Sequence, residues 1–360
     1  MTRSMQQETT DRQAAERFCR QILPAVSRTF AISIRALPGA LGRAVLDAYL
    51  ICRIADTVED EATLAPAAKA ELLDQLLACF DDAAAATAYG ALVPPLTGDA
   101  EHVRLVRHTG HVFAVYRALP IQTQAHVRRW VTEMVRGMRA FVLRYPDGIR
   151  IQTLDEFREY CYYVAGTVGY LLTDLWHEHA ASVSPRRHAE LRERCRAFAQ
   201  ALQTVNILKD VARDAVDENS IYVPEQSLRA HGSSHATILA PEFLRQNHAA
   251  VAELIELAWR DLEEARQYLL LLPRRAVAIR LFCVLPLLFA YATLRDLTGS
   301  TAMLTPHGHP KISRREVKRL LWSGVLLVMS NSGTRWLIER ARRGTFGISP
   351  TLASERGALA

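Results

Sequence analysis

The sequence predicts an all-α protein that folds as a single-domain helical bundle. Ala, Leu, Arg and Glu dominate the composition, whereas Gly (17) and Pro (15) are sparse among the 360 residues, which favours helices throughout. Two stretches far apart in the chain also place acidic residues at helical spacing. The hydrophobic content of 49% is sufficient for a sizeable core and excludes an intrinsically disordered chain.

Charge and cysteine usage narrow the class of protein further. The net charge of +6 suits anionic substrates or an anionic membrane surface, but the basic residues are too dispersed for a nucleic-acid binder. None of the six Cys residues forms a CxxC motif, so we expect reduced, buried thiols in a cytoplasmic protein. The polar beginning of the chain predicts no signal peptide.

At the N-terminus we expect a disordered tail over residues 1–11, followed by one folded domain over 12–342 and a second tail over 343–360. The first helix is predicted to run from about Asp11 to Ile22, because Pro24 interrupts it. Arg28 follows, and its guanidinium either clamps a phosphate or is an ordinary surface charge. The sequence alone leaves both interpretations open.

Pro38-Gly39 marks a turn before a helix predicted over residues 40–60. This helix ends in Asp56-Thr57-Val58-Glu59-Asp60, where Asp56, Glu59 and Asp60 share one face. Three carboxylates at this spacing suit Mg²⁺, which takes one or two carboxylates and completes its shell with waters and substrate phosphates. A solvated acidic turn is the alternative for this motif taken alone. Arg53 lies near the same face and either reaches a phosphate or pairs with an acid.

The middle of the chain is predicted to be helical, with Thr153 and Glu156 forming a capping box before Tyr160. Gly166 and Gly169 lie inside that helix and indicate close approach of another helix or of an apolar ligand. The predicted helices of this region cover residues 67–88, 100–118 and 121–143, with a loop over 89–99.

A second acidic helix is predicted over residues 186–214, in which Asn206, Asp210 and Asp214 are spaced four residues apart on one face. Gln203 shares that face, and Lys209 and Arg213 are basic neighbours. Two oxygen-rich faces from distant helices can oppose each other across a bundle. The two acidic helices together therefore predict a cage for several Mg²⁺ ions and a diphosphate.

The C-terminal third is predicted to contain helices over residues 224–229, 240–271, 274–296 and 313–342. The apolar segment 279–294 contains Arg280 and Pro286, so we expect a buried core helix rather than a membrane span. Residues 320–328 are also apolar, but the polar stretch from Ser330 follows. This pattern argues against a membrane span and leaves peripheral contact with a membrane open.

Four motifs resemble the squalene/phytoene synthase family, and squalene synthases most closely. They are Ser27-Arg-Thr-Phe30, Arg53-Ile-Ala-Asp-Thr-Val-Glu-Asp60, Tyr160-Cys-Tyr-Tyr-Val-Ala-Gly166 and Asn206-Ile-Leu-Lys-Asp-Val-Ala-Arg-Asp214. The segment Arg280-Leu-Phe-Cys-Val-Leu-Pro286, with Lys311 downstream, is similar to a segment that helps to hold NADPH in squalene synthases. The resemblance implies a fold of the isoprenoid synthase type with a central apolar cavity.

The resemblance implies that two farnesyl diphosphates condense to presqualene diphosphate, which is then reduced by NADPH to squalene. It implies Mg²⁺ ligands at Asp56, Glu59, Asp60, Asn206, Asp210 and Asp214, and a proton-handling role for Tyr160. Arg28, Arg53, Lys209 and Lys311 match family positions that bind phosphates. The substrate-binding residues that it implies are Ser27, Phe30, Tyr49, Val164, Ala165, Gly166, Gly169 and Gln203.

Three departures from the family pattern leave alternatives open. Lys209 stands where an Arg is usual, Ser313 stands where an Arg is expected, and we expect no counterpart of the C-terminal anchor of eukaryotic members. A non-reducing synthase of dehydrosqualene or phytoene, an inactive assembly factor, and a head-to-tail or cyclising enzyme are the alternatives. We expect a monomer that binds no nucleic acid and lies in the cytoplasm, or on the inner face of the membrane.

Overall fold

A computed structural model describes residues 3–27, 30–306, 308 and 310–344 of the chain. Within these residues the only β pairing is an isolated parallel bridge between Arg150 and Ile221, so the predicted all-α class is confirmed. The α-helices are α1 (Arg3–Val26), α2 (Phe30–Arg35), α3 (Gly39–Glu59), α4 (Pro66–Ala78), α5 (Ala83–Leu92), α6 (Ala100–Arg107), α7 (Thr109–Arg117), α8 (Ile121–Arg144), α9 (Leu154–Cys161), α10 (Thr167–His179), α11 (Pro185–Asp217), α12 (Glu225–Ala230), α13 (Leu244–Leu271), α14 (Val277–Thr298), α15 (Arg314–Leu327) and α16 (Asn331–Arg343).

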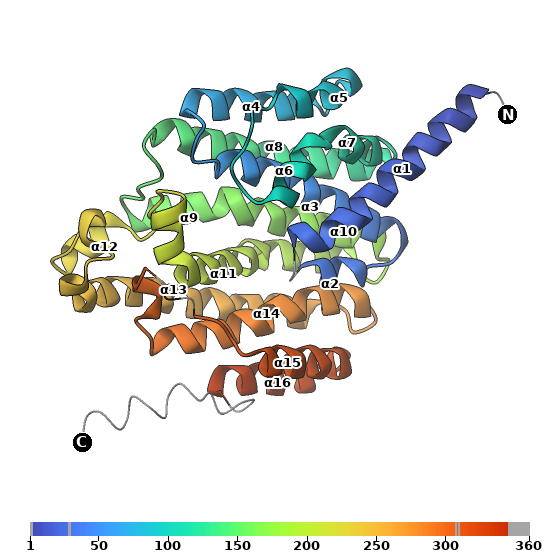
Figure 1. Cartoon of the computed structure of the whole chain (residues 1–360). Helices are drawn as coiled ribbons and strands as arrows, with labels where there is room; N and C mark the ends of the chain where they lie inside the picture. Colours follow the sequence, from blue (N-terminus) through green and yellow to red (C-terminus); the bar gives the residue numbers. More distant parts are fainter. Residues whose placement is uncertain (1–2, 28–29, 307, 309, 345–360) are drawn as a thin grey trace.

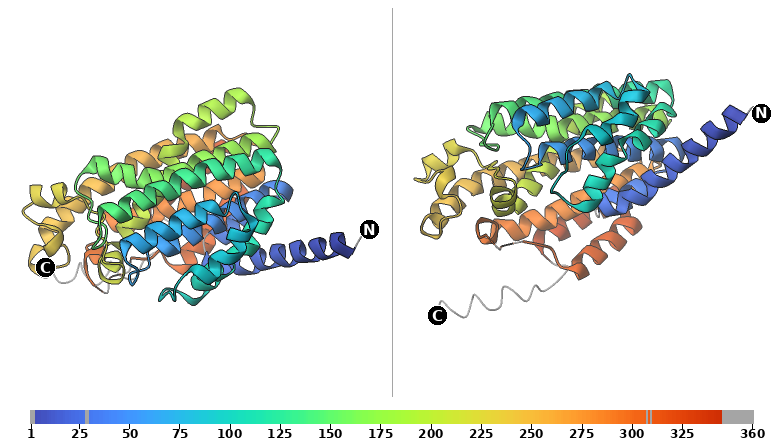
Figure 2. Two further views of the ribbon diagram at one scale, coloured as in Figure 1. Left: turned by 90° about the horizontal axis from the view of Figure 1, so that it is seen from above. Right: turned by 45° about the horizontal axis from the view of Figure 1, so that its top comes forward.

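The helices stack in layers around α11, which packs against α10, α13 and α14 (Figure 1). On one side, α8 packs on α10, α3 packs on α8, and α4 also covers α8. On the other side, α14 packs on α13, and α15 with α16 covers α14 as the outermost layer (Figures 1 and 2). A π-helical turn, Tyr162–Gly166, joins α9 to α10, and such turns often mark functional sites.

Helix α14 is a buried core helix, as the sequence predicted for residues 279–294. Among the described residues, α14 alone is long and apolar enough to cross a membrane, but 72% of its apolar window is buried inside the protein. Pro286 lies within this helix. All six cysteines of the chain are free and buried, as expected.

Several predicted boundaries are wrong because local capping or packing overrides the pattern. Helix α1 begins at Arg3, within the expected tail, and continues through Pro24 to Val26, whose side chain is buried. Asp82 accepts a hydrogen bond from the N–H of Ala84, which starts α5 where one helix over 67–88 was expected. Because α5 extends to Leu92, the loop expected over 89–99 begins later.

Two other predicted helices are also divided. The helix over 100–118 divides at His108 into α6 and α7. The helix expected over 313–342 divides at Ser330, whose hydroxyl accepts from the N–H of Gly333 and caps α16. Thr153 caps α9 as predicted, but Glu156 accepts from the N–H of Gln152 and not from Thr153, so half of the predicted capping box forms.

Asp47 on α3 is fully buried, and neither of its carboxylate oxygens has a hydrogen-bond partner among the described residues. Burial raises the pKa of this carboxyl well above its usual value of 3.8. A raised folded-state pKa contributes stability below the unfolded pKa that is lost as the pH rises through the folded value.

We therefore expect the Asp47→Asn variant to unfold at a higher temperature than the wild type at pH 8, with the difference shrinking toward pH 4. Thermal unfolding followed by circular dichroism across this range measures it. The exposed Asp155→Asn variant is the control. If the unfolding temperatures of the wild type and of Asp47→Asn changed in parallel with pH, the raised pKa of Asp47 would be refuted.

Candidate active site

A cavity of about 980 Å³ lies between α3, α11, α14 and the first turn of α15. This volume is at the upper end of typical ligand pockets. Its lining includes most of the residues that the sequence singled out: Ser27, Phe30, Tyr49, Arg53, Asp56, Glu59, Asp60, Tyr160, Val164, Gln203, Asn206, Lys209, Asp210, Asp214 and Lys311. Residues from five separate regions of the chain therefore meet at one cavity.

The acidic end of α3 forms one wall. Glu59 is 5% exposed, and burial, followed by the carboxylates of Asp60 and Asp56, raises its pKa well above the usual value. The side chain of Asp60 is exposed to the water in the open cavity, and protein surrounds that cavity. Its enclosure, together with Glu218 and Asp56, raises its pKa as well. This wall is thus strained electrostatically in the absence of a cation.

The opposing wall is α11, where Asn206, Asp210 and Asp214 line the cavity. Burial and the nearby Asp210 and Asp60 raise the pKa of Asp214 to about 7, although Arg213 opposes the shift. Asp60, at the end of α3, and Asp214, on α11, line the same cavity, and Asp60 is close enough for its charge to raise the pKa of Asp214. The two acidic faces therefore border one cavity, which agrees with the expectation from the sequence.

Glu218, which caps the C-terminal end of α11, is an acidic member of the site that the sequence analysis missed. Burial and then the carboxylate of Asp214 raise its pKa to about 7. The signal was present, because Glu218 continues the four-residue spacing of Asn206, Asp210 and Asp214.

Basic side chains already sit among these acids. Arg53 lies 3.4 Å from a carboxylate oxygen of Asp56, and its other terminal nitrogen donates to the Tyr49 hydroxyl at 3.3 Å. Lys209 lies 3.0 Å from Asp210. Arg213, the second basic neighbour that the sequence indicated, lies 3.4 Å from both Asp210 and Asp214. These cations offset part of the negative charge and are placed to meet phosphate oxygens.

The acidic residues suit a Mg²⁺ site in which substrate phosphates supply part of the coordination shell. Among the described residues, no three His, Cys, Asp or Glu side chains converge on a single ion site. They line two walls instead, and one carboxylate oxygen of Glu59 is buried without a hydrogen-bond partner. An all-oxygen set that supplies a few ligands from each wall suits Mg²⁺, whose shell usually retains waters and substrate phosphates.

Tyr160 forms a buried pair with Tyr222, which the sequence analysis missed. The Tyr160 hydroxyl donates to the Tyr222 hydroxyl at 3.3 Å, and the ring centroids are 4.9 Å apart. Burial, followed by the carboxylate of Glu59, raises the pKa of Tyr160 well above its usual value. Tyr160 is therefore protonated at neutral pH and can donate a hydrogen bond or a proton.

Three predicted substrate-binding residues lie elsewhere. Ala165, Gly166 and Gly169 are not among the described residues that line the cavity. A Cβ at Gly169 would lie 2.3 Å from the backbone oxygen of Cys195, so Gly169 allows α10 to approach α11. Of the two interpretations of the glycines, close helix packing explains Gly169. Arg28 lies outside the described residues.

The segment that resembles an NADPH-holding region divides between core and cavity. Arg280 is 0% exposed and donates to the backbone oxygens of Leu269, Leu272 and Val328 at 3.2, 2.7 and 2.7 Å. It therefore ties α13 to the turn between α15 and α16. Lys311 and Arg314 line the cavity, whereas Ser313 caps α15 by accepting from the N–H of Glu316.

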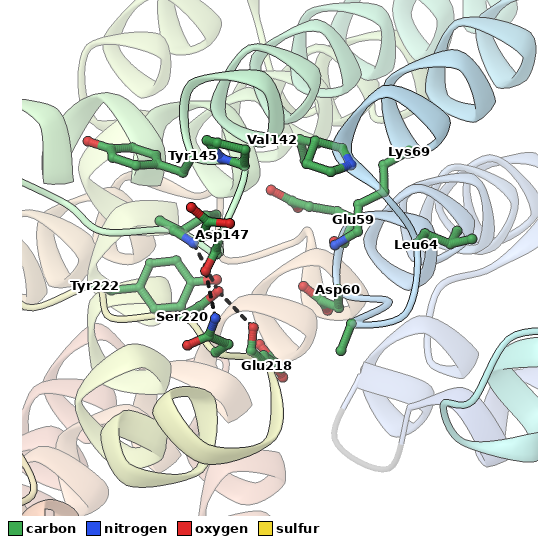
Figure 3. A pocket seen from close by; sticks show the side chains of 16 residues that line it. Glu59, Asp60, Leu64, Lys69, Val142, Tyr145, Asp147, Glu218, Ser220 and Tyr222 are labelled. Carbon is green, nitrogen blue, oxygen red and sulfur yellow. Dashed lines mark hydrogen bonds between the residues drawn. The ribbon is translucent and has the colours of Figure 1, made fainter.

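A second cavity of about 170 Å³ lies behind the acidic cluster (Figure 3). It shares Glu59, Asp60, Glu218 and Tyr222 with the large cavity. Lys69 points toward it and donates to the backbone oxygen of Glu59 at 2.6 Å. Glu59, Asp60 and Glu218 therefore border both cavities, which lie next to each other.

The raised pKa values predict a pH-dependent stability of the metal-free protein. Groups such as Asp214 and Glu218, whose pKa rises on folding to about 7, contribute stability at low pH that is lost as the pH approaches 7 and above. We expect Glu218→Gln to reduce the difference between the unfolding temperatures at pH 5 and pH 8.

This prediction is tested by thermal unfolding in EDTA, with the exposed Glu256→Gln as the control. Adding Mg²⁺ should raise the unfolding temperature of the wild type more at pH 8 than at pH 5, since the ion binds the ionised carboxylates. If the unfolding temperatures of Glu218→Gln and of the wild type depended equally on pH, Glu218 would not interact with the acidic residues of the site.

Comparisons with known proteins agree with this geometry. A family model described as squalene/phytoene synthase matches residues 23–316. The squalene synthase of Schizosaccharomyces pombe is 28% identical over 281 residues, which cover 77% of this chain and 58% of that protein. The squalene synthase of Eremothecium gossypii is 28% identical over 79% of this chain and 63% of its own length. The chain thus spans about three fifths of these curated relatives.

A solved structure shows the same fold. A ligand complex of TcSQS superposes with a TM-score of 0.76 at 22% identity, over 93% of this chain and 100% of the other.

Proposed function

Because the chain belongs to the squalene/phytoene synthase family, we propose that it is a squalene synthase. In this proposal, two farnesyl diphosphates condense head to head to presqualene diphosphate, with loss of one diphosphate and one proton. Presqualene diphosphate then loses its own diphosphate and accepts a hydride to give squalene. The observation that carries it is the pair of opposed acidic helices, α3 and α11, on a cavity of about 980 Å³ that extends past them to α14. Similarity to squalene synthases at 28% identity supports it.

The acidic residues would hold the metal that the diphosphates need. Asp56, Glu59 and Asp60 would act from α3, and Asn206, Asp210 and Asp214 from α11, with Glu218 added to the set. Bound Mg²⁺ would neutralise the charge that develops on the leaving diphosphate. Arg53, Lys209 and Arg213 lie beside these acids and would pair with phosphate oxygens as the carbon–oxygen bond breaks.

The rest of the cavity would protect and direct the carbocation. Val164, Leu202, Phe289 and Ala290 give it an apolar lining, which excludes the water that would quench a cation. Because Tyr160 is protonated, it would relay the proton that is lost when the cyclopropane ring closes: its hydroxyl oxygen would accept that proton as its own proton passes on to the released diphosphate. Its hydrogen bond to Tyr222 would orient the hydroxyl.

The reductive step would use the rim of the cavity. NADPH, when bound, would supply the hydride. Lys311 and Arg314 line the cavity and would pair with its phosphates. Arg314 lies directly after Ser313, so it would supply the basic side chain that the family resemblance expects at Ser313.

The stoichiometry of diphosphate release tests the condensation. With farnesyl diphosphate and Mg²⁺ but no NADPH, we expect one diphosphate released for every two farnesyl diphosphates consumed. A cyclising enzyme would release one diphosphate for each substrate molecule. Geranylgeranyl diphosphate, offered in competition, tests whether the substrate has fifteen or twenty carbons; preferential consumption of the longer substrate would contradict the proposal.

A further inference from the structure

The positive charge of the chain is concentrated in its last two described helices. Residues 311–344 contain nine Lys or Arg residues and two Glu residues, a net charge of +7, whereas the whole chain carries +6. The remainder is therefore close to neutral. One of the two acids, Glu316, is buried and paired with Arg295 at 2.8 Å, so it does not offset the outward-facing basic residues.

An exposed apolar stripe runs along the same layer. Trp322, Val325 and Leu326 lie on one face of α15, and Met329 continues their spacing in the turn after the helix; they are 65%, 42%, 78% and 60% exposed. Trp336 of α16 is 52% exposed. Five of the twelve exposed large hydrophobic side chains of the described chain thus lie on these two neighbouring helices or, for Met329, in the turn that joins them. Packing among the described residues does not explain this stripe.

The inward face of α15 is already packed against the core. Glu316, Leu320, Gly324 and Val328 are buried at four-residue spacing, and a Cβ at Gly324 would lie 3.0 Å from a methyl carbon of Leu285 on α14. The outward face has a basic half, with Arg315 and Lys318, followed by the apolar stripe. A helix with two apolar faces, one buried and one exposed beside basic residues, has the pattern of a membrane-surface helix.

We propose that α15 and α16 dock the protein onto an anionic lipid bilayer through an α15–α16 face formed by Arg315, Lys318, Trp322, Leu326, Met329 and Trp336. Leu326 and Met329 would enter the boundary between head groups and acyl chains, and the two Trp rings suit the interface. Arg315 and Lys318 would meet anionic head groups, at about 1 kcal/mol for each basic residue.

Charge favours a membrane over a second copy of the chain. A symmetric dimer through this face would bring two surfaces of the same strong positive charge together, which opposes association. An anionic bilayer complements that charge and accepts the apolar stripe. Because Lys311, just before α15, and Arg314 and Val317, in its first turn, also line the large cavity, docking would place this side of the cavity close to the lipid.

Flotation of the full chain with vesicles tests the proposal without any turnover, and so independently of the proposed function. We expect binding to vesicles of phosphatidylglycerol and phosphatidylcholine, little binding to pure phosphatidylcholine, and weaker binding as salt rises. The triple variant Trp322→Ser, Leu326→Ser, Met329→Ser and the double variant Arg315→Glu, Lys318→Glu should each bind at least about ten-fold more weakly.

Matched controls carry the same chemical changes elsewhere. Leu92→Ser with Ile121→Ser removes exposed apolar side chains from other helices, and Arg129→Glu with Arg136→Glu reverses charges on α8. Both should bind vesicles as the wild type does. Thermal unfolding checks that all variants fold.

Two outcomes would overturn the proposal. One is a wild type that does not float with anionic vesicles, or that floats no better than the triple variant. The other is a wild-type dimer in light scattering that the triple variant converts to a monomer, which would make the α15–α16 face a self-association surface. Quenching of Trp fluorescence by brominated lipid, lost in the Trp322→Phe, Trp336→Phe variant, would support the proposal.

Discussion

The Asp60→Asn variant is expected to lose turnover by roughly 10³-fold while its metal-free form becomes more stable than the wild type at pH 8. Asp60 belongs to the acidic wall at the end of α3, where the surrounding protein, and then the charges of Glu218 and Asp56, raise the pKa of its carboxyl. A raised pKa means that the ionised group destabilises the folded protein above its unfolded pKa. Asn is neutral at every pH, so it removes this destabilisation together with the metal ligand.

Diphosphate release and thermal unfolding in EDTA measure the two effects on the same preparation. Asp210→Asn, on the opposing helix, should lose activity similarly with an unchanged helical circular-dichroism spectrum. Asp217→Asn is the matched control, because Asp217 is exposed on α11 and is not among the residues that line the cavity. Normal turnover in Asp60→Asn or Asp210→Asn would refute the model of opposed metal-binding faces.

The Arg280→Met variant is expected to lose about 3 kcal/mol of unfolding free energy, which for a chain of this size lowers the unfolding temperature by roughly 5 °C. Arg280 satisfies the backbone oxygens of Leu269 and Leu272 near the C-terminal end of α13, and that of Val328 between α15 and α16. Without the guanidinium, these buried acceptors lose a partner, and each such loss is costly.

Thermal and urea unfolding test this, with exposed Arg274→Met as the control in the loop before α14. Arg280→Lys should lie between wild type and Arg280→Met, because an ammonium group cannot reproduce the planar fork. A stable Arg280→Met variant with a raised KM for NADPH would contradict the structural role and restore the cofactor role implied by the resemblance.

The sequence predicted those parts of the site that repeat along a helix. Asp56, Glu59 and Asp60 on α3 and the acids of α11 could be placed on common faces because helical periodicity fixes them. The burial of α14 also followed from its composition and from Arg280. The sequence did not reveal Tyr222, because the loop that holds it is positioned by backbone pairing of Ile221 with Ile149 and Ile151.

The errors have local causes. Ser330 and Asp82 each cap a new helix in a stretch whose propensity favours continuation, so two predicted helices are divided. Pro24 does not end α1, because it lies in the last turns and the buried Ile22, Leu23 and Val26 hold the helix in place. The role of Gly169 depended on a neighbour distant in sequence, Cys195 on α11, which periodicity cannot supply.

Product analysis by gas chromatography and mass spectrometry tests the central claim most directly. Purified protein is incubated with farnesyl diphosphate and Mg²⁺, with and without NADPH, and phosphatase treatment reveals diphosphate products as alcohols. The account predicts presqualene diphosphate without NADPH and squalene with it. Dehydrosqualene under both conditions, or the absence of any C30 product, would contradict it.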